Sequence, residues 1–259
     1  MGALNLEHVE YPDGDGQPMG ESDLHMGAMA EAVFTLREWF AGAEVYVAGN
    51  NFLYFVEGNP KKCVSPDCYM VRGVPQLPLR KSFKTWEERD RTPSFVLEVT
   101  SHSTRRNDAG SKLALYRDVL EVREYFQFDP EGDWIPEVLR GLVLRKGQYG
   151  PAAVGPTGRL TSAELGLELA VVNGELRFFQ PGEGAPLPIR RELRDRAADS
   201  DARAAEATAQ AAEATAQAAE ATAKAAEATA KAAESDSRAA AAEAEVTRLR
   251  AELDRLAGG

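Results

Sequence analysis

Two acidic residues stand at positions where a carboxylate needs a partner. Asp67 follows Pro66 at the start of one predicted strand, and Glu98 lies near the end of another, whose residues 95–97 are all apolar. A carboxylate inside an apolar strand is costly unless it is paired or bound to a metal. If the two strands are neighbours, Asp67 and Glu98 meet at one sheet edge. With a carbonyl such as that of Val99, they would form the hard oxygen site that suits Mg²⁺.

Such a site would support hydrolysis by a metal-activated water. That chemistry also needs a lysine, which would orient or deprotonate the water and meet the negative charge that develops. The two cysteines, Cys63 and Cys68, have no histidine close in sequence to complete a zinc site. We expect them to be packed thiols in a reducing, cytoplasmic setting.

The elements that must position these groups follow from hydrophobic periodicity. Helical spacing predicts one helix over 21–40 and a second over 107–119, with Asn107 or Asp108 as its N-cap. Alternation predicts strands at 68–71, 94–99, 124–128, 167–171 and 175–179, and hairpins over 45–56 and 138–149. The 94–99 run is typical of a strand covered on both faces, so it should be central. This order predicts a mixed α/β sheet of the α+β type rather than repeated βαβ units.

The composition changes after Ile189, and we expect a first domain over 1–190 and a helical tail over 191–259. The tail contains the seven-residue repeat AAEATAQ or AAEATAK, in which alanine strongly favours helix. Three Glu-to-Lys or Glu-to-Arg pairs at i,i+4 spacing add about 0.2–0.5 kcal/mol each. The heptad frame predicts a coiled coil that makes the protein a homo-oligomer, a dimer, or else a lone spacer helix. Its seam is mostly alanine and ends in Val246, Leu249, Leu253 and Leu256.

Charge and hydropathy narrow the function classes. The chain has 259 residues, a net charge of −11 and three histidines, which argues against a general polyanion-binding surface, so any nucleic-acid contact must be local. The tail holds 10 basic and 14 acidic residues, which leaves −7 for the first 190. No run approaches the roughly 18 apolar residues of a membrane span, and the N-terminus lacks the order of a signal peptide. We therefore expect a protein that does not enter a membrane and stays in the cytoplasm.

Several motifs in one order carry a resemblance to a known family. They are S-P-D at 65–67, P-S-F-V-L-E-V-T-S at 93–101, D-A-G-S-K-L-A-L-Y at 108–116 and V-R-E-Y-F-Q-F-D-P at 122–130. The segments Y-P-D-G-D-G-Q-P-M at 11–19 and V-A-G-N-N-F-L-Y-F-V-E-G-N at 47–59 flank them. This pattern resembles the Uma-two family of restriction-endonuclease-like proteins, within the PD-(D/E)XK nuclease superfamily. The resemblance covers about residues 10–182 and leaves out the tail.

The resemblance implies a restriction-endonuclease-like core in which Asp67 and Glu98 are catalytic metal ligands for Mg²⁺ or Mn²⁺. The superfamily places a lysine two residues after the glutamate, but Thr100 stands there in this chain. The family pattern moves that lysine to the following helix, where Lys112 matches it. Asp108 and Tyr116 lie one turn away on the same face and are candidate accessory residues.

Other residues complete the expected site. His25 and Glu31 on the first helix are candidates to reach the metal from the opposite side, or else to be ordinary packing and surface residues. Arg105 and Arg106 are candidates to contact a DNA backbone phosphate, in a local patch with Arg89 and Arg91.

Two function hypotheses follow. The first is a Mg²⁺-dependent DNA endonuclease of the restriction type. The second is a catalytically inactive nuclease-fold interaction protein that oligomerises through its tail. The direction of Lys112 discriminates between them, because a Lys112 that points away from Asp67 and Glu98 favours the second.

Overall fold

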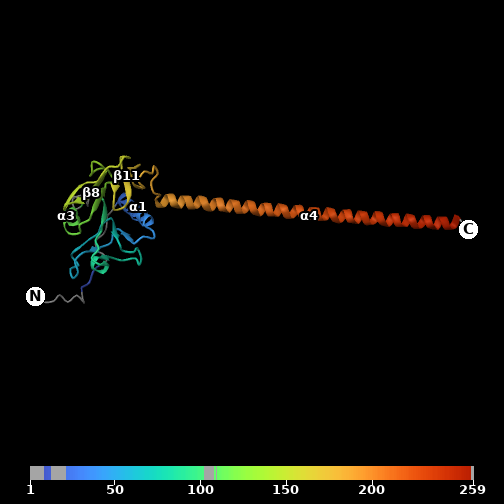
Figure 1. Cartoon of the computed structure of the whole chain (residues 1–259), viewed down its shortest axis with the longest axis horizontal. Helices are drawn as coiled ribbons and strands as arrows, with labels where there is room; N and C mark the ends of the chain where they lie inside the picture. Colours follow the sequence, from blue (N-terminus) through green and yellow to red (C-terminus); the bar gives the residue numbers. More distant parts are fainter. Residues whose placement is uncertain (1–8, 13–21, 102–107, 109, 258–259) are drawn as a thin grey trace. The chain divides into compact units, whose positions relative to one another are not determined.

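The structure is a computed structural model, and it describes residues 9–12, 22–101, 108 and 110–257. The chain divides into two units, 1–193 and 194–259. The first unit contains every strand of the described chain and both of the helices that flank the central sheet (Figure 1).

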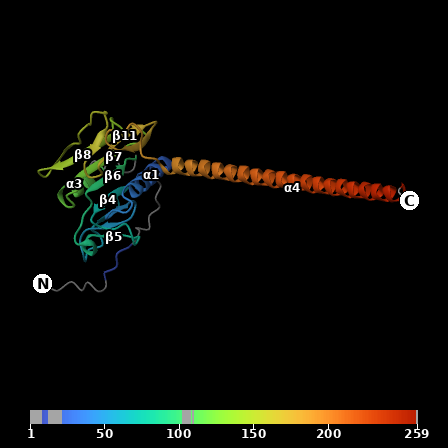
Figure 2. The same ribbon diagram turned by 45° about the vertical axis from the view of Figure 1, so that its right-hand side comes forward.

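A six-stranded mixed sheet forms the centre of the first unit. Its order is β1 (Val45–Ala48), β4 (Cys68–Arg72), β6 (Phe95–Val99), β7 (Glu124–Phe128), β8 (Leu139–Arg145) and β9 (Gln148–Pro151). Only β6 and β7 of this sheet run parallel to each other, and the other neighbours are antiparallel. Figure 2 shows β4, β6, β7 and β8 side by side. The predicted central position of the 94–99 strand is confirmed.

Two three-stranded sheets extend this core. One contains β10 (Leu160–Ser162), β11 (Leu167–Val172) and β12 (Glu175–Phe179). The other has β2 (Leu53–Tyr54) between β3 (Cys63–Val64) and β5 (Phe83–Lys84), and the short 3-10 helix η2 (Thr85–Glu88) follows it. The short strands β3, β5 and β10 are too brief to show a clear alternation in the sequence.

The two faces of the central sheet carry separate apolar clusters. Helix α1 (Asp23–Trp39) packs against β1, β4 and β6, and its Ala32 and Leu36 join a cluster with Leu97 and Val99. Helix α3 (Ser111–Asp118) contributes Tyr116 to the other cluster, which contains Val96. Because side chains alternate along a strand, Glu98 projects to the α3 face, as Val96 does.

Local sequence explains where α1 begins. The Ser22 side chain accepts a hydrogen bond from the His25 backbone N–H at 3.2 Å, which caps the helix. Asp23 in the first turn and Arg37 in the last turn both suit the helix dipole. The cap fixes the first turn, in which the buried His25 lies.

The predicted hairpin over 45–56 is wrong. β1 pairs with β4, whereas β2 joins β3 and β5 in a separate sheet. The segment between them is held by the chain before β4, because the Asn50 N–H donates to the Pro66 carbonyl at 2.8 Å. At Gly49 a Cβ would lie 2.0 Å from the Asp67 carbonyl oxygen, so the two backbones are in direct contact there.

The start of α3 also differs from expectation. Gly110 occupies the N-cap position without a side-chain cap, and Asp108 lies before it. Asn107, the other predicted cap, lies outside the described residues. Asp108 instead uses its carboxylate in an ion pair with Lys112.

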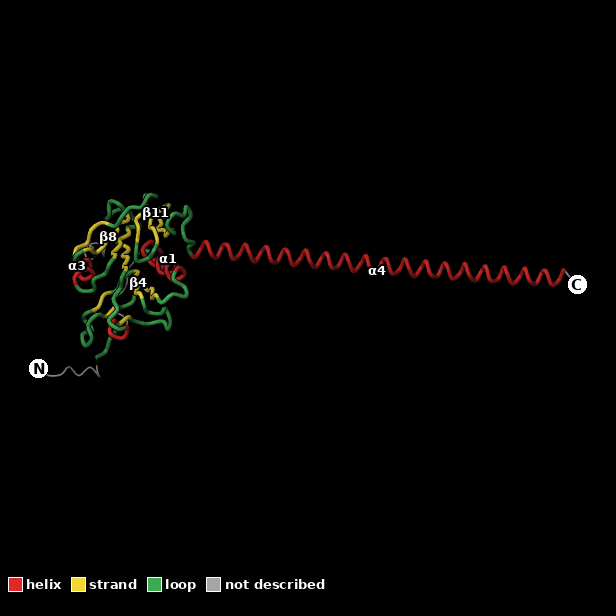
Figure 3. The backbone as a smooth tube through the Cα atoms, viewed as in Figure 1, coloured by secondary structure: helices red, strands yellow, loops and turns green. Residues whose placement is uncertain are grey.

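The tail forms the single helix α4 (Arg190–Ala257), drawn without a break in Figure 3. The predicted i,i+4 pairs Glu220–Lys224, Glu227–Lys231 and Glu234–Arg238 are all present. Threonines of the repeat donate to the carbonyls four residues earlier, as Thr208 does to Ala204. Within the described chain, neither α4 nor any other helix has the length and apolar character to cross a membrane.

The close approach at Gly49 predicts opposite effects for the same substitution at two glycines. Gly49→Ala should lower the free energy of unfolding by about 1–3 kcal/mol, because its Cβ meets the Asp67 backbone and Val33. Gly27→Ala in α1 should raise it by about 0.5–1 kcal/mol, since a Cβ there has no atom within 4 Å. Urea unfolding of both variants checks this, and equal stabilities would contradict the packing described at Gly49.

Candidate active site

The two strands that carry the acidic residues are neighbours, which is the condition under which Asp67 and Glu98 were expected to meet. β4 and β6 are antiparallel with Cys68 opposite Leu97, so Asp67 and Glu98 lie side by side at one end of the sheet. The Asp67 carboxylate accepts a hydrogen bond from the Val99 N–H at 2.8 Å (Oδ2 to N). This bond ties the start of β4 to the end of β6 and fixes Asp67 beside Glu98.

Glu98 is fully buried and has a partner for each carboxylate oxygen. Lys112 Nζ lies 2.8 Å from Oε2, and the Tyr116 hydroxyl donates to Oε1 at 2.5 Å. Both partners come from α3, one helical turn apart. Lys112 therefore points toward the acidic pair, as the endonuclease hypothesis requires.

Asp108 completes the α3 side of the site. Its Oδ1 lies 3.3 Å from Lys112 Nζ, and its backbone carbonyl accepts a hydrogen bond from the Tyr125 hydroxyl at 2.9 Å. Tyr125 in turn packs on Tyr116, with ring centroids 5.2 Å apart. Asp108, Lys112 and Tyr116 thus share one face, as expected.

The two candidate site residues on α1, His25 and Glu31, have different partners. His25 is buried, and its Nε2 lies 3.3 Å from Asp67 Oδ1, so it approaches the site from the α1 side. Glu31 instead accepts hydrogen bonds from the Arg190 N–H at 3.0 Å and from Arg190 Nε at 3.4 Å. Of these two, the structure joins only His25 to the site by a direct contact.

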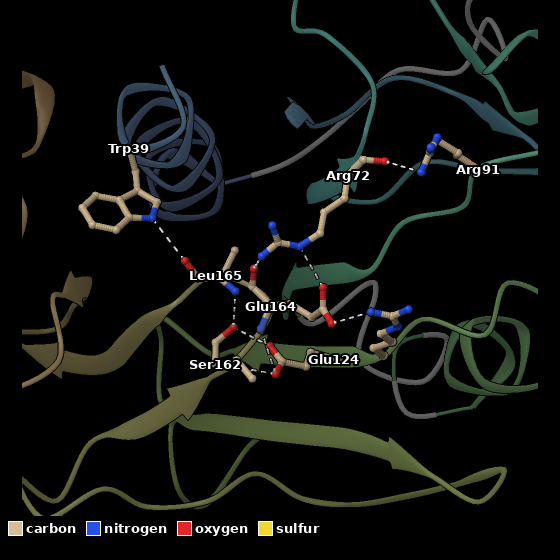
Figure 4. Close-up of polar contacts among 9 residues, drawn as sticks. Trp39, Arg72, Arg91, Glu124, Ser162, Glu164 and Leu165 are labelled. Carbon is tan, nitrogen blue, oxygen red and sulfur yellow. Dashed lines mark hydrogen bonds and ion pairs between the residues drawn. The ribbon is translucent and has the colours of Figure 1, made fainter. Parts of the chain in front are cut away.

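The arginines of the expected basic patch, Arg105, Arg106, Arg89 and Arg91, are only partly described by the structure. Arg105 and Arg106 lie outside the described residues. Arg91 donates to the Arg72 carbonyl at 3.2 Å, at the end of β4 opposite to Asp67. Figure 4 shows Arg91 donating to the Arg72 carbonyl and the Arg72 side chain reaching Glu164, whose carboxylate also pairs with Arg123. Arg91 is therefore at the other end of the strands from Glu98.

Burial and charge set the protonation states. Burial raises the pKa of Glu98 well above its usual value, although Lys112 opposes the shift. Burial alone would lower the pKa of Lys112, but the charges of Glu98, Asp108 and Asp67 outweigh it and raise that pKa. Burial likewise opposes the charged form of Asp67, yet His25 and Lys112 bring its pKa below the usual value. Lys112 is therefore an ammonium that stabilises negative charge, and it is not placed to accept a proton.

The residues present fit a small divalent cation. Asp67 and Glu98 offer hard carboxylate oxygens side by side, which are the ligands that Mg²⁺ prefers. The buried Thr100 hydroxyl, two residues after Glu98, has no hydrogen-bond partner in the described chain. Within the described ranges there is no group of three or more His, Cys, Asp or Glu side chains spaced for a metal, so other ligands would be water, carbonyl or substrate oxygens.

Sequence reasoning missed two polar residues beside the site. Gln127 on β7 lies opposite Glu98, and Arg140 on β8 lies opposite Gln127. Gln127 is buried, and its side-chain oxygen accepts hydrogen bonds from Arg140. The alternation of 124–128 places Gln127 on the face of Tyr125, but only the cross-strand register places it beside Glu98.

The architecture and site are those of a mixed α+β protein with a buried carboxylate pair and a lysine from a following helix. Comparison with family models makes this more specific: the model of the Uma2 family, described as "Putative restriction endonuclease", matches residues 3–175. The chain belongs to this family, which confirms the resemblance.

The chain was also compared with solved structures and with curated proteins. The solved structures include a "putative nuclease belonging to DUF820" from Anabaena variabilis, to which the chain is similar at 13% identity. That match covers 57% of this chain and 76% of the other, with a TM-score of 0.41. No curated protein matches.

The burial of Glu98 predicts a large cost for removing its cation. Lys112→Met should lower the free energy of unfolding by about 3–5 kcal/mol, because it leaves a buried carboxylate unpaired. Lys84→Met removes a lysine paired with the exposed Glu87 and should cost less than about 1 kcal/mol. Urea unfolding of both variants measures the difference.

The same variant predicts a dependence on pH. The pKa of Glu98 is raised in the folded protein, so the folded state holds this proton more tightly than the unfolded state. Without Lys112 that pKa rises further, and the cost of Lys112→Met should shrink as pH falls and Glu98 becomes neutral. A cost that is small and independent of pH would contradict the assigned burial and pairing.

Proposed function

We propose that the protein is an endonuclease that hydrolyses phosphodiester bonds of DNA and depends on Mg²⁺ or Mn²⁺ held by Asp67 and Glu98. The observation that carries the proposal is the position of Lys112. Its Nζ lies 2.8 Å from the fully buried Glu98, although Thr100 occupies the usual lysine position. Membership of the Uma2 family supports the same class of activity.

The side chains have distinct roles in this proposal. A bound divalent cation would polarise a phosphoryl oxygen and activate water. His25 orients Asp67, while Tyr116 orients Glu98. The Lys112 ammonium stabilises the negative charge that develops on the phosphoryl group. Because Lys112 keeps its proton, removal of a proton from the attacking water falls to another group or to solvent.

Plasmid cleavage tests this function. Wild-type protein should nick or linearise supercoiled plasmid in Mg²⁺ or Mn²⁺, and EDTA should abolish cleavage. Lys112→Met should slow the chemical step by about 10²–10³, as removal of one preorganised donor does, and Lys84→Met serves as the control lysine. Circular dichroism shows whether each variant is folded at the assay temperature, and Lys112→Arg provides a variant that keeps the buried charge paired.

The possible outcomes are distinct. Cleavage that survives Lys112→Met would remove the role of Lys112. A folded wild type that is inactive with every divalent ion tested would instead favour the nuclease-fold interaction protein, the second hypothesis from the sequence.

We also propose that α4 promotes self-association through the seam at its C-terminal end. Val246, Leu249 and Leu253 are all exposed in the single chain, at heptad spacing on one face of the helix. A stripe of this kind is stabilised when a second helix covers it. Two-fold association would also suit cleavage of both DNA strands.

Sedimentation of the full chain tests the seam. The double variant Leu249→Glu/Leu253→Glu should lower the mass of the assembly to that of a monomer, because it places charges inside the interface. Thr247→Glu/Ala251→Glu adds the same charge outside the seam and should leave the mass unchanged. A wild-type mass equal to that of a monomer would leave only the spacer-helix interpretation.

A further inference from the structure

A row of polar residues continues from Glu98 across the sheet. In the parallel β6–β7 pair Glu98 lies opposite Gln127, and in the antiparallel β7–β8 pair Gln127 lies opposite Arg140. Paired residues on neighbouring strands project to the same face. The three side chains therefore follow one another across adjacent strands, each about 5 Å apart.

Contacts establish which face this is. Tyr125, two residues before Gln127, packs on Tyr116 of α3. Leu142, two residues after Arg140, packs against the same apolar cluster. Gln127 and Arg140 thus lie on the α3 face, as Glu98 and Lys112 do.

Arg140 differs from other partly buried arginines of the protein. Its Nε and Nη2 donate to the side-chain oxygen of Gln127, with Nε at 3.1 Å. In contrast, the guanidinium groups of Arg80, Arg159 and Arg177 each lie against a carboxylate, those of Glu88, Glu168 and Glu192. Among the described residues no carboxylate pairs with Arg140, so a neutral amide fixes its position and leaves its positive charge without a counter-charge.

Arg140 and the acidic groups of the site all influence the pKa of the same side chain, Tyr125. Burial raises the pKa of Tyr125, Glu98 and Asp108 raise it further, and Arg140 lowers it. Lys112 already contacts Glu98 and Asp108. Arg140 is therefore a cation beside the site that forms no ion pair with a carboxylate of the described residues.

We propose that Gln127 and Arg140 form a phosphate-binding subsite that holds a backbone phosphate of the nucleic acid near the scissile bond. This inference rests on the proposed function. A guanidinium has five N–H donors, of which Gln127 takes two, and the rest suit phosphate oxygens. Gln127 acts as a positioning residue, because its buried amide fixes the orientation of the guanidinium. The subsite offsets the repulsion that the carboxylates of Asp67, Glu98 and Asp108 exert on a polyanion.

DNA binding as a function of salt tests the subsite in the full chain. The probe is a short fluorescein-labelled duplex, followed by anisotropy in Ca²⁺ and also without divalent ions. Arg140→Gln should weaken binding about tenfold. It should also reduce the slope of log K against log salt by about 0.9, the value for one phosphate contact. Arg145→Gln removes the same charge from the exposed end of β8 and should change neither quantity.

A second variant covers the case in which Arg140→Gln does not fold. Gln127→Glu has nearly the same shape and gives Arg140 a carboxylate partner, so it should also weaken binding and lower the slope. If wild type binds the duplex and both folded variants keep its slope, the subsite is wrong and the proposed function stands. If wild type does not bind the duplex, the subsite is overturned too, and plasmid cleavage decides separately whether the proposed function fails.

Discussion

The buried carboxylate of Glu98 is the constraint on which the rest of the site depends. A glutamate in a fully buried central strand requires compensation, and α3 supplies it through one ammonium and one hydroxyl. Replacement of a whole buried ion pair by well-packed apolar residues is often neutral or stabilising, whereas removal of one partner alone is costly. Stability alone therefore does not account for an ion pair in the core of this sheet, and the proposed metal site gives it a chemical role.

The elements around Glu98 are arranged so that two layers converge on one sheet end. α1 approaches Asp67 through His25, and α3 approaches Glu98 through Lys112 and Tyr116. The contact between the Gly49 and Asp67 backbones fixes the segment before β4. These contacts hold the acidic side chains in place before any ligand binds, and such preorganisation is what electrostatic catalysis requires.

The sequence allowed the main elements and the acidic pair to be predicted, because local signals define them. The apolar run around Glu98 marked a central strand, and the sequence predicted that Asp67 and Glu98 meet if their strands are neighbours. The structure supplies that pairing, which is antiparallel. Local sequence patterns did not predict strand pairing or register where contacts between distant parts of the chain determine them. Residues 45–56 read as a hairpin, yet the interaction of Gly49 and Asn50 with the chain before β4 separates the two strands. Gln127 and Arg140 were missed because only cross-strand register brings them beside Glu98, and Lys112 was identified through family resemblance rather than through spacing.

The central claim is that Asp67 and Glu98 together hold a divalent cation, and calorimetric titration with Mn²⁺ tests it most directly. The account predicts that the wild type binds the ion, and that Asp67→Ala and Glu98→Ala each abolish or greatly weaken that binding while the folded state persists by circular dichroism. The Glu31 carboxylate lies against Arg190 in the wild type, so the Glu31→Ala variant should bind Mn²⁺ as the wild type does. Equal binding by all four proteins would contradict the account.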